Sequence, residues 1–209
     1  MASAQKWPTC EADSGRLNPG LNRKRVLEPM KTLVQKAKTF SATKHRHQTR
    51  KHDTIPYTAH LDGVVEILKR HGITDQVIIA AAYLHDTVEK TDTSVGEIID
   101  LFGTDVARLV YWLTDDDRGN RKVRKLMSAW RLSRAPWEAK LIKLADLVDN
   151  TQYIVEHDPD SAPGYILEKK QTMWMMADEE GDRITRLPLF REAMRNAAPG
   201  SPGVEHRAG

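Results

Sequence analysis

Apolar residues recur along most of the chain at the three- and four-residue spacing that is typical of amphipathic helices. The clearest example comprises Leu61, Val64, Val65 and Leu68. The stretch 75–88 is apolar on nearly every side and rich in alanine, which favours a buried helix over a strand. Ser94 and Glu97 form a capping-box pattern ahead of the next apolar run. In all, the pattern predicts helices near 26–43, 60–72, 75–88, 94–103, 104–113, 137–157, 163–178 and 182–197.

No segment shows a convincing alternation of apolar and polar residues, which a half-buried strand would require. The pattern therefore predicts one all-α domain over about 23–196. Residues 1–22 have little periodicity, and residues 197–209 are small and rich in proline and glycine. We therefore expect a flexible N-terminal leader and a disordered C-terminal tail on either side of the domain.

The composition agrees with a single globular domain, because 209 residues with 40% hydrophobic side chains can bury a sizeable core. The formal net charge of +3 is too small to indicate a nucleic-acid partner by itself. The chain has no apolar run of about 18 residues and no secretory signal at its N-terminus. Cys10 is the only cysteine, which excludes an intrachain disulfide. These features predict a cytoplasmic protein without a membrane or nucleic-acid partner, and they leave a homo-oligomer open.

Four polar residues lie in or beside segments that are otherwise apolar. His85 and Asp86 directly follow the run VIIAAAYL, Asp146 lies within LIKLADLVDN, and His60 begins an amphipathic helix. A carboxylate near a helical core is costly unless it is paired or binds a metal. The alternative is that all four are satisfied polar residues of the core, and the spacing alone does not decide between these interpretations.

Helix geometry places further polar groups beside these four. Three pairs of residues four positions apart share a helix face: His85 with Glu89, Asp86 with Lys90, and Asp146 with Asn150. If the helices pack together, two polar stripes can line one cleft. Two imidazoles and two carboxylates suit manganese, iron or zinc better than magnesium or calcium. Such a metal lowers the pKa of a bound water, and Glu89 is placed to orient or deprotonate that water.

A basic run follows the acidic segment LTDDD. It contains Arg118, Arg121, Lys122, Arg124, Lys125, Arg131 and Arg134 and no acidic residue. This segment is a candidate phosphate clamp over the cleft, and Lys122 is a candidate to bind substrate. A solvated basic helix face is the alternative. Nucleic acid is a weaker interpretation, because Trp130 is the only aromatic residue among these cations.

Four ordered sequence blocks resemble a known family. His60, the pair His85-Asp86 and Asp146 reproduce the H…HD…D pattern of the HD-domain phosphohydrolases. The blocks KHRHQTRK (44–51), PYTAH (56–60), AAYLHDTVEKTDTS (81–94) and KLADLVDN (143–150) are similar to the hydrolase domain of the RelA/SpoT family. The resemblance covers about 28–160, and the chain's size is most similar to the small alarmone hydrolases, which include animal members.

The resemblance implies an all-α HD-domain bundle with Mn²⁺ bound in a cleft by the four residues of the H…HD…D pattern. It implies hydrolysis of the 3′-pyrophosphate of guanosine tetra- or pentaphosphate (ppGpp or pppGpp), the alarmones of the stringent response. Carried over by motif, Arg50 and Lys51 contact the base region, Asn150 touches the nucleotide, and Glu89 serves the attacking water. Related small enzymes accept adenine alarmones or remove the 2′-phosphate of NADPH, and these substrates remain alternatives.

Two positions depart from the family pattern. The family usually has Glu-Asp where this chain has Glu89-Lys90, and two acids there are thought to position the water. Lys90 can pair with Asp86 or reach a substrate phosphate, which makes it a second candidate catalytic residue beside Glu89. Leu147 stands where the family commonly has a basic residue. A degenerate nucleotide-binding regulator without turnover is therefore a further hypothesis, although all four metal ligands are retained.

Overall fold

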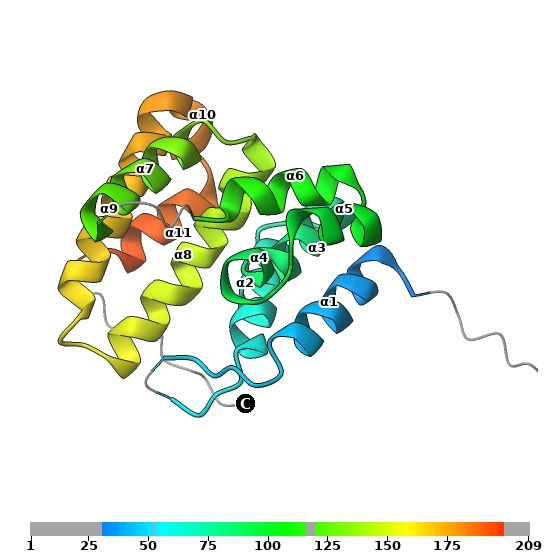
Figure 1. Cartoon of the computed structure of the whole chain (residues 1–209). Helices are drawn as coiled ribbons and strands as arrows, with labels where there is room; N and C mark the ends of the chain where they lie inside the picture. The colour runs from blue at the N-terminus through cyan, green and yellow to red at the C-terminus, as the bar shows by residue number, and fades with distance from the viewer. Residues whose placement is uncertain (1–30, 52, 116–119, 199–209) are drawn as a thin grey trace, which may run out of the picture. The chain divides into compact units, whose positions relative to one another are not determined.

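The computed structural model describes residues 31–51, 53–115 and 120–198, and helices dominate this part of the chain (Figure 1). Within these ranges the one extended pairing outside helices is an isolated bridge between Thr49 and Pro56. The predicted all-α class is therefore confirmed. The helices are α1 (Leu33–Lys44), α2 (Thr58–Arg70), α3 (Gln76–Leu84), α4 (Thr87–Lys90), α5 (Val95–Phe102), α6 (Thr104–Leu113), α7 (Arg121–Ser133), α8 (Trp137–His157), α9 (Ala162–Glu180), α10 (Asp182–Thr185) and α11 (Pro188–Asn196).

Helix α3 forms the centre of the first half of the domain. Asp75 caps its N-terminus, where the carboxylate accepts hydrogen bonds from the backbone N–H groups of Val77 and Ile78 at 2.8 and 3.1 Å. Every residue from Ile78 to Leu84 is buried. The all-round apolar character of this segment follows, because α3 packs against α1, α2, α6 and α8.

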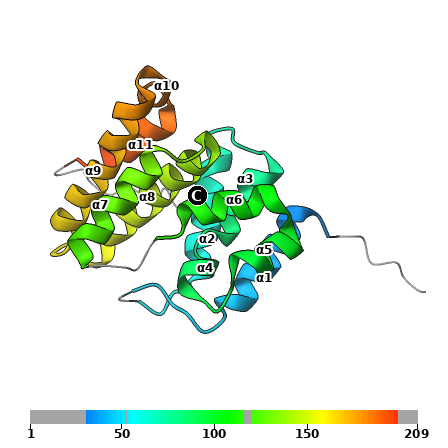
Figure 2. The same cartoon turned by 45° about the horizontal axis from the view of Figure 1, so that its top comes forward.

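Helix α8 carries Asp146 and connects the two halves of the domain. It packs against α2, α3 and α6, and also against α7, α9 and α11. Figures 1 and 2 show α8 running between these two groups of helices. A helix with neighbours on both sides is buried over most of its circumference. This explains why α8 has apolar residues on more than one face and why Asp146 is only 5% exposed.

The predicted helix over 75–88 is wrong at its C-terminal end, because α3 ends at Leu84 and a separate short helix, α4, begins at Thr87. The Thr87 hydroxyl donates to the carbonyl of Leu84 at 2.6 Å and satisfies one acceptor at this break. Consecutive residues of a continuous helix do not face each other. The break therefore allows His85 and Asp86, which are adjacent in sequence, to approach the same point.

Two other predicted helices also have different bounds. Thr32 caps α1, so this helix begins later than the predicted 26–43, and residues 26–30 lie outside the described ranges. The predicted helix 182–197 is divided into α10 and α11, and Pro188 occupies the first turn of α11. Other predicted features also lie outside the described residues: the leader 1–22 with Cys10, Arg118, and residues 199–209 of the predicted tail.

In the described part of the chain, no helix combines the length and hydropathy that crossing a bilayer requires.

Candidate metal centre

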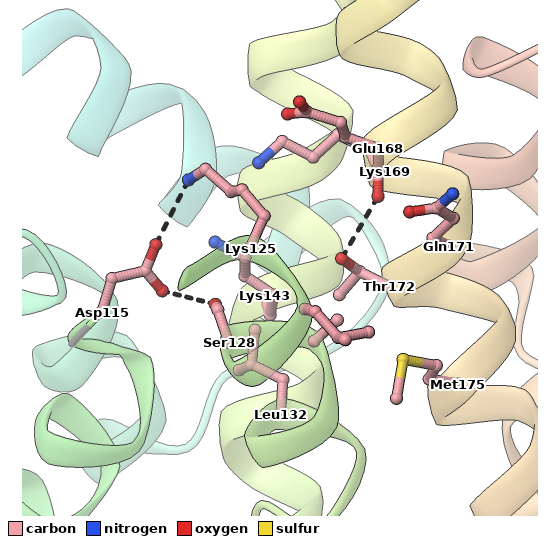
Figure 3. A pocket seen from close by; sticks show the side chains of 12 residues that line it. Asp115, Lys125, Ser128, Leu132, Lys143, Glu168, Lys169, Gln171, Thr172 and Met175 are labelled. Atoms are coloured by element: carbon pink, nitrogen blue, oxygen red, sulfur yellow. Dashed lines mark hydrogen bonds and ion pairs between the residues drawn. The ribbon is translucent and has the colours of Figure 1, made fainter. Parts of the chain in front are cut away.

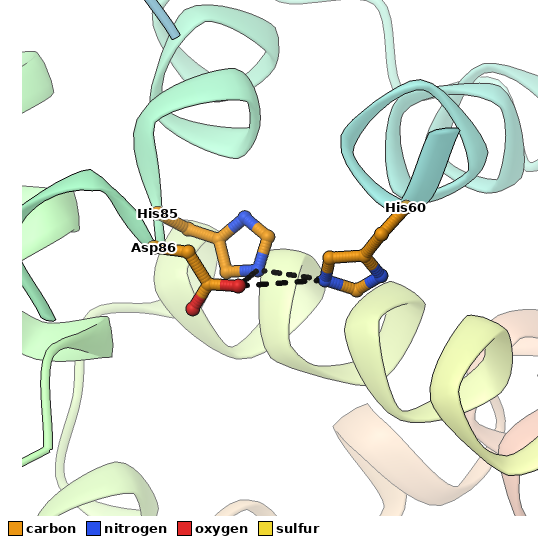
Figure 4. A group of neighbouring side chains, drawn as sticks. All are labelled: His60, His85 and Asp86. Carbon is orange, nitrogen blue, oxygen red and sulfur yellow. Dashed lines mark hydrogen bonds and ion pairs between the residues drawn. The ribbon is translucent and has the colours of Figure 1, made fainter. Parts of the chain in front are cut away.

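The four residues of the H…HD…D pattern converge on one buried point. His60 comes from the first turn of α2, His85 and Asp86 from the junction of α3 and α4, and Asp146 from the middle of α8. All four are buried, with exposures between 1% and 8%. Figure 4 shows the two imidazoles and the Asp86 carboxylate pointing toward one another in front of α8.

The separations between the inward-facing atoms match those of neighbouring ligands around one ion. The Nε2 atoms of His60 and His85 are 3.3 Å apart, and one ligand atom from each of these residues and Asp86 lies within 4.8 Å of the others. Oδ1 of Asp146 lies 3.4 Å from Nε2 of His60 and 3.7 Å from Nε2 of His85. Ligand bonds of about 2.1 Å place neighbouring ligands of an octahedral ion roughly 3 Å apart. His60, His85 and Asp86 therefore have the spacing of ligands around one ion, and Asp146 lies beside both imidazoles.

The outward nitrogens of both imidazoles have oxygen partners. Nδ1 of His60 lies 2.7 Å from Oδ2 of Asp149, and Nδ1 of His85 lies 2.7 Å from the carbonyl of Ala82. With a proton donated from each Nδ1, both Nε2 atoms keep a free lone pair toward the cluster, as in histidines that bind metals. A Cβ at Gly63 would collide with Oδ1 of Asp149, so glycine permits the close approach of α2 and α8 that this contact requires.

The charges of the cluster favour a cation. Burial lowers the pKa of His60, yet hydrogen bonds to Asp146, Asp149 and Asp86 raise it to about 10. Burial likewise lowers the pKa of His85, and the charge of Asp86 and the hydrogen bond to Asp146 raise it to about 9. Without a metal, the carboxylates thus draw protons onto both imidazoles. Two nitrogen and two oxygen donors in a site that attracts positive charge fit a divalent transition metal.

Asp146 is held by two neighbours on its own helix. The Lys143 ammonium lies 2.8 Å from Oδ2, and the Asn150 amide donates to Oδ1 at 2.5 Å. Burial raises the pKa of Asp146, but the Lys143 ammonium and the two imidazoles hold it well below its usual range. The predicted pairing of Asp146 with Asn150 is therefore present. Leu147 is 1% exposed and belongs to the core, so the cation beside Asp146 comes from Lys143.

Asp86 also has its predicted partner at the next turn. The Lys90 ammonium lies 2.9 Å from Oδ2 of Asp86, and the Tyr57 hydroxyl donates a short hydrogen bond to the same oxygen. Glu89 behaves differently from Lys90, because it is exposed and accepts a hydrogen bond from the backbone N–H of Asp115 at 3.1 Å. Since α3 and α4 are separate helices, Glu89 and His85 do not belong to one continuous helix face.

The predicted nucleotide contacts lie around the cluster with partners of their own. Arg50 is buried, forms a 2.8 Å ion pair with Asp149 and stacks 3.6 Å from the ring centroid of Tyr153. Its guanidinium also lies 3.4 Å from the side-chain oxygen of Asn150. Lys51 is exposed, and its carbonyl accepts a hydrogen bond from the Tyr153 hydroxyl at 2.9 Å. Arg50 therefore contacts both Asn150, a predicted nucleotide contact, and Asp149, which orients His60.

The basic run divides into two parts with different surroundings. Arg131 donates to the carbonyls of Thr114 and Tyr111, so it satisfies acceptors at the C-terminal end of α6. Lys125 instead forms a 3.3 Å ion pair with Asp115 and lines a cavity of about 40 Å³. Lys122 is the second residue of α7, but its side chain lies outside the described atoms.

The cavity contains three lysines from different helices (Figure 3). Lys125 belongs to α7, Lys143 to α8 and Lys169 to α9. Burial and the neighbouring Lys143 lower the pKa of Lys169 to about 8. Because Lys143 also contacts Asp146, this basic cavity adjoins the buried cluster.

Several residues that shape the site were not predicted from the sequence. Tyr57, Lys143 and Asp149 each lie three positions from a predicted ligand, which places them on the same side of the chain where it is helical. A search of the i±3 neighbours of each ligand would have found all three. Lys169 carries no comparable signal, because its helix contributes no residue to the H…HD…D pattern.

The helical fold and its buried cluster of two imidazoles and two carboxylates define an all-α protein with a candidate metal centre. The family model described as HD domain matches residues 37–179. The guanosine-3′,5′-bis(diphosphate) 3′-pyrophosphohydrolase MESH1 of Drosophila melanogaster is 36% identical over 147 residues, which cover 69% of this chain and 80% of that protein. The human protein of the same name is 42% identical over 126 residues, covering 59% and 70% of the two chains.

A solved structure shows the same relationship. The structure described as a metazoan ortholog of SpoT that hydrolyzes ppGpp has a TM-score of 0.70 and 29% sequence identity, and the alignment covers 81% of this chain and 96% of that chain. The chain therefore belongs to the HD domain family, in the group that contains the MESH1 proteins.

Proposed function

We propose that this protein hydrolyses the 3′-pyrophosphate of ppGpp or pppGpp with a water molecule at the cluster of His60, His85, Asp86 and Asp146. The convergence of these four side chains carries the proposal, and the similarity to the MESH1 proteins along most of their length supports the substrate. Hydrolysis of ppGpp cleaves the bond between the 3′ oxygen and its pyrophosphate. Its products are GDP and pyrophosphate.

Mn²⁺ is the proposed metal, because two imidazole nitrogens and two carboxylate oxygens suit a borderline ion better than Mg²⁺ or Ca²⁺. The chemistry that such an ion supplies is activation of a water molecule and polarisation of a phosphoryl oxygen. Glu89 is proposed to orient or deprotonate that water. Asp149 and the carbonyl of Ala82 fix the two imidazoles, so these rings need little rearrangement during the reaction.

The substrate carries several negative charges, and the chain places cations beside the cluster. Lys125, Lys143 and Lys169 line the adjoining cavity, where they are proposed to attract phosphate oxygens. Arg50, Lys51, Asn150 and Lys122 are proposed to bind the rest of the nucleotide. Ammonium groups in a partly buried site interact strongly with phosphate, because water screens them less than at the surface.

Lys169 gives this proposal a dependence on pH. Its pKa of about 8 means that it is charged at pH 7 and mostly neutral at pH 9. Because only the charged form attracts phosphate, we expect KM for ppGpp to rise between pH 7 and pH 9. Lys169→Met should raise KM at pH 7 and remove the part of the pH dependence that is due to this residue. Identical KM profiles for the two proteins would exclude Lys169 from substrate binding.

A product assay tests the proposed function. Metal-free protein is reloaded with Mn²⁺ and incubated separately with ppGpp, its adenine analogue and NADPH, and the products are separated by ion-exchange chromatography. We expect GDP and pyrophosphate from ppGpp in equal amounts. If the protein released orthophosphate from NADPH with a higher kcat/KM than it turned over ppGpp, NADPH would replace ppGpp as the proposed substrate. Tight binding of ppGpp without turnover at any metal would indicate a regulator in place of an enzyme.

A further inference from the structure

One oxygen of Asp86 has more partners than it can accommodate together with a metal. Oδ2 of this residue accepts hydrogen bonds from the Tyr57 hydroxyl and from the Lys90 ammonium. The same oxygen faces the cluster, at 3.3 Å from Nε2 of His85 and 3.6 Å from Nε2 of His60. A carboxylate oxygen has about two lone-pair sites. Tyr57 and Lys90 already occupy both, so a metal that binds Oδ2 competes with these two donors.

Tyr57 is the less mobile of the two donors. Its ring stacks on His45 with 4.9 Å between the ring centroids and packs edge-on against His60 at 5.4 Å. Lys90 has a flexible stem, and 39% of its side-chain surface is exposed. Its backbone is anchored, because the Gln48 amide donates to the carbonyl of Lys90 at 2.7 Å. The Lys90 ammonium also donates to the Tyr57 hydroxyl and lies 4.8 Å from the centroid of that ring. Its flexible stem can move it away from Asp86 while the backbone of α4 stays in place, whereas the Tyr57 ring cannot move without repacking two histidines.

We propose that Lys90 is a tethered cation that binds Asp86 in the metal-free protein and is displaced when the metal binds. This inference rests on the metal site of the proposed function. Lys90 neutralises a ligand carboxylate when the site is empty, and each metal ion that binds must break a charge-assisted hydrogen bond. Lys90 thus lowers the metal affinity of the site, and it is a positioning residue for Asp86 because it acts through that carboxylate.

The first test measures metal affinity without any substrate. Calorimetric titration of the metal-free protein with Mn²⁺ is compared for wild type, Lys90→Met and Lys44→Met. Methionine keeps most of the apolar stem of lysine and removes the charge. We expect Lys90→Met to bind Mn²⁺ about tenfold more tightly, because charge-assisted hydrogen bonds are among the strong ones. Lys44 pairs with Asp92 and Glu97 and not with a predicted ligand, so Lys44→Met controls for the loss of one positive charge and should change the affinity less than about twofold.

The second test follows the Lys90 ammonium itself. Proton–nitrogen NMR of lysine ammonium groups is recorded before and after addition of Zn²⁺, which is diamagnetic, and the Lys90 signal is assigned from its loss in Lys90→Met. We expect this signal to move when zinc binds, while the signal of Lys38, which pairs with Asp62, stays in place.

Three results would overturn the inference. Equal Mn²⁺ affinity of wild type and Lys90→Met would do so while leaving the proposed function intact. An unchanged Lys90 signal in zinc-bound protein would show that Asp86 receives the metal without releasing Lys90. Absence of Mn²⁺ and Zn²⁺ binding in both proteins would overturn the inference together with the metal site on which it rests.

Discussion

Asp146→Asn is expected to abolish retention of Mn²⁺ and to lower the rate of ppGpp hydrolysis roughly 10³-fold, since a metal contributes several kcal/mol to such a reaction. The amide keeps the shape of the side chain but loses the anionic oxygen that lies 3.4 Å from Nε2 of His60. Metal content is measured by atomic emission after desalting, and hydrolysis is measured by GDP release. Glu156→Gln, an exposed acid-to-amide change on the same helix, is the matched control and should behave like wild type.

Asp146→Asn also affects folding, and a second variant separates this effect from the loss of metal. Lys143 has only 17% of its side chain exposed and pairs with Asp146, so the single change leaves a buried ammonium without its nearest partner. Removal of one member of a buried pair costs about 3–5 kcal/mol. Lys143→Met combined with Asp146→Asn should recover most of this stability and still retain no Mn²⁺. A stable double variant that binds one Mn²⁺ per chain would contradict the assignment of Asp146 as a ligand.

The sequence predicted the cluster because its members are polar residues in apolar surroundings, which is a rare and visible pattern. His85, Asp86 and Asp146 interrupt or follow segments whose other residues are buried, so each needs a partner. The same reasoning could not separate Asp146 from Asp149 without the family resemblance, because both carboxylates lie in one short segment. Only the structure distinguishes the two: Asp146 lies beside the Nε2 atoms of both imidazoles, whereas Asp149 contacts the outward Nδ1 of His60.

The break at His85 had no signal in local composition. The residues around it include neither proline nor glycine, and the apolar pattern alone predicts a continuous helix. The residue at the break instead has tertiary contacts, because His85 lies beside His60 of α2 and Asp146 of α8. The break before α11 is a different case, since Pro188 is a sequence signal for a new helix start at that position. The fold class was therefore predictable from periodicity, whereas the geometry at the cluster depended on contacts between distant segments.

Lys140 is a further position that sequence patterns could not predict, because lysine is almost never fully buried unless it is paired. Its side chain is 2% exposed on α8, where it forms an ion pair with Glu180 at the end of α9. Glu180 also lies 3.3 Å from Arg183. The two members of the pair are therefore unequal, since Glu180 has a second cation and a partly exposed position, whereas Lys140 depends on Glu180.

Glu180→Ala is accordingly expected to lower the free energy of unfolding by about 3–5 kcal/mol, because it leaves the Lys140 ammonium buried without this partner. Lys140→Met should cost less, since methionine fills the same space and Glu180 keeps Arg183. Equilibrium denaturant unfolding of the metal-free proteins measures both changes. Glu179→Ala, at the exposed neighbouring position, is the control and should change the free energy by less than about 0.5 kcal/mol.

The double variant Lys140→Met with Glu180→Leu decides whether the buried charge causes the loss. Replacing both members of a buried pair with apolar residues is often neutral or stabilising, because neither charge then has to leave water on folding. We therefore expect the double variant to regain most of the stability that Glu180→Ala loses. If it remained as unstable as Glu180→Ala, the loss would arise from packing between α8 and α9, and the unpaired ammonium of Lys140 would not be its cause.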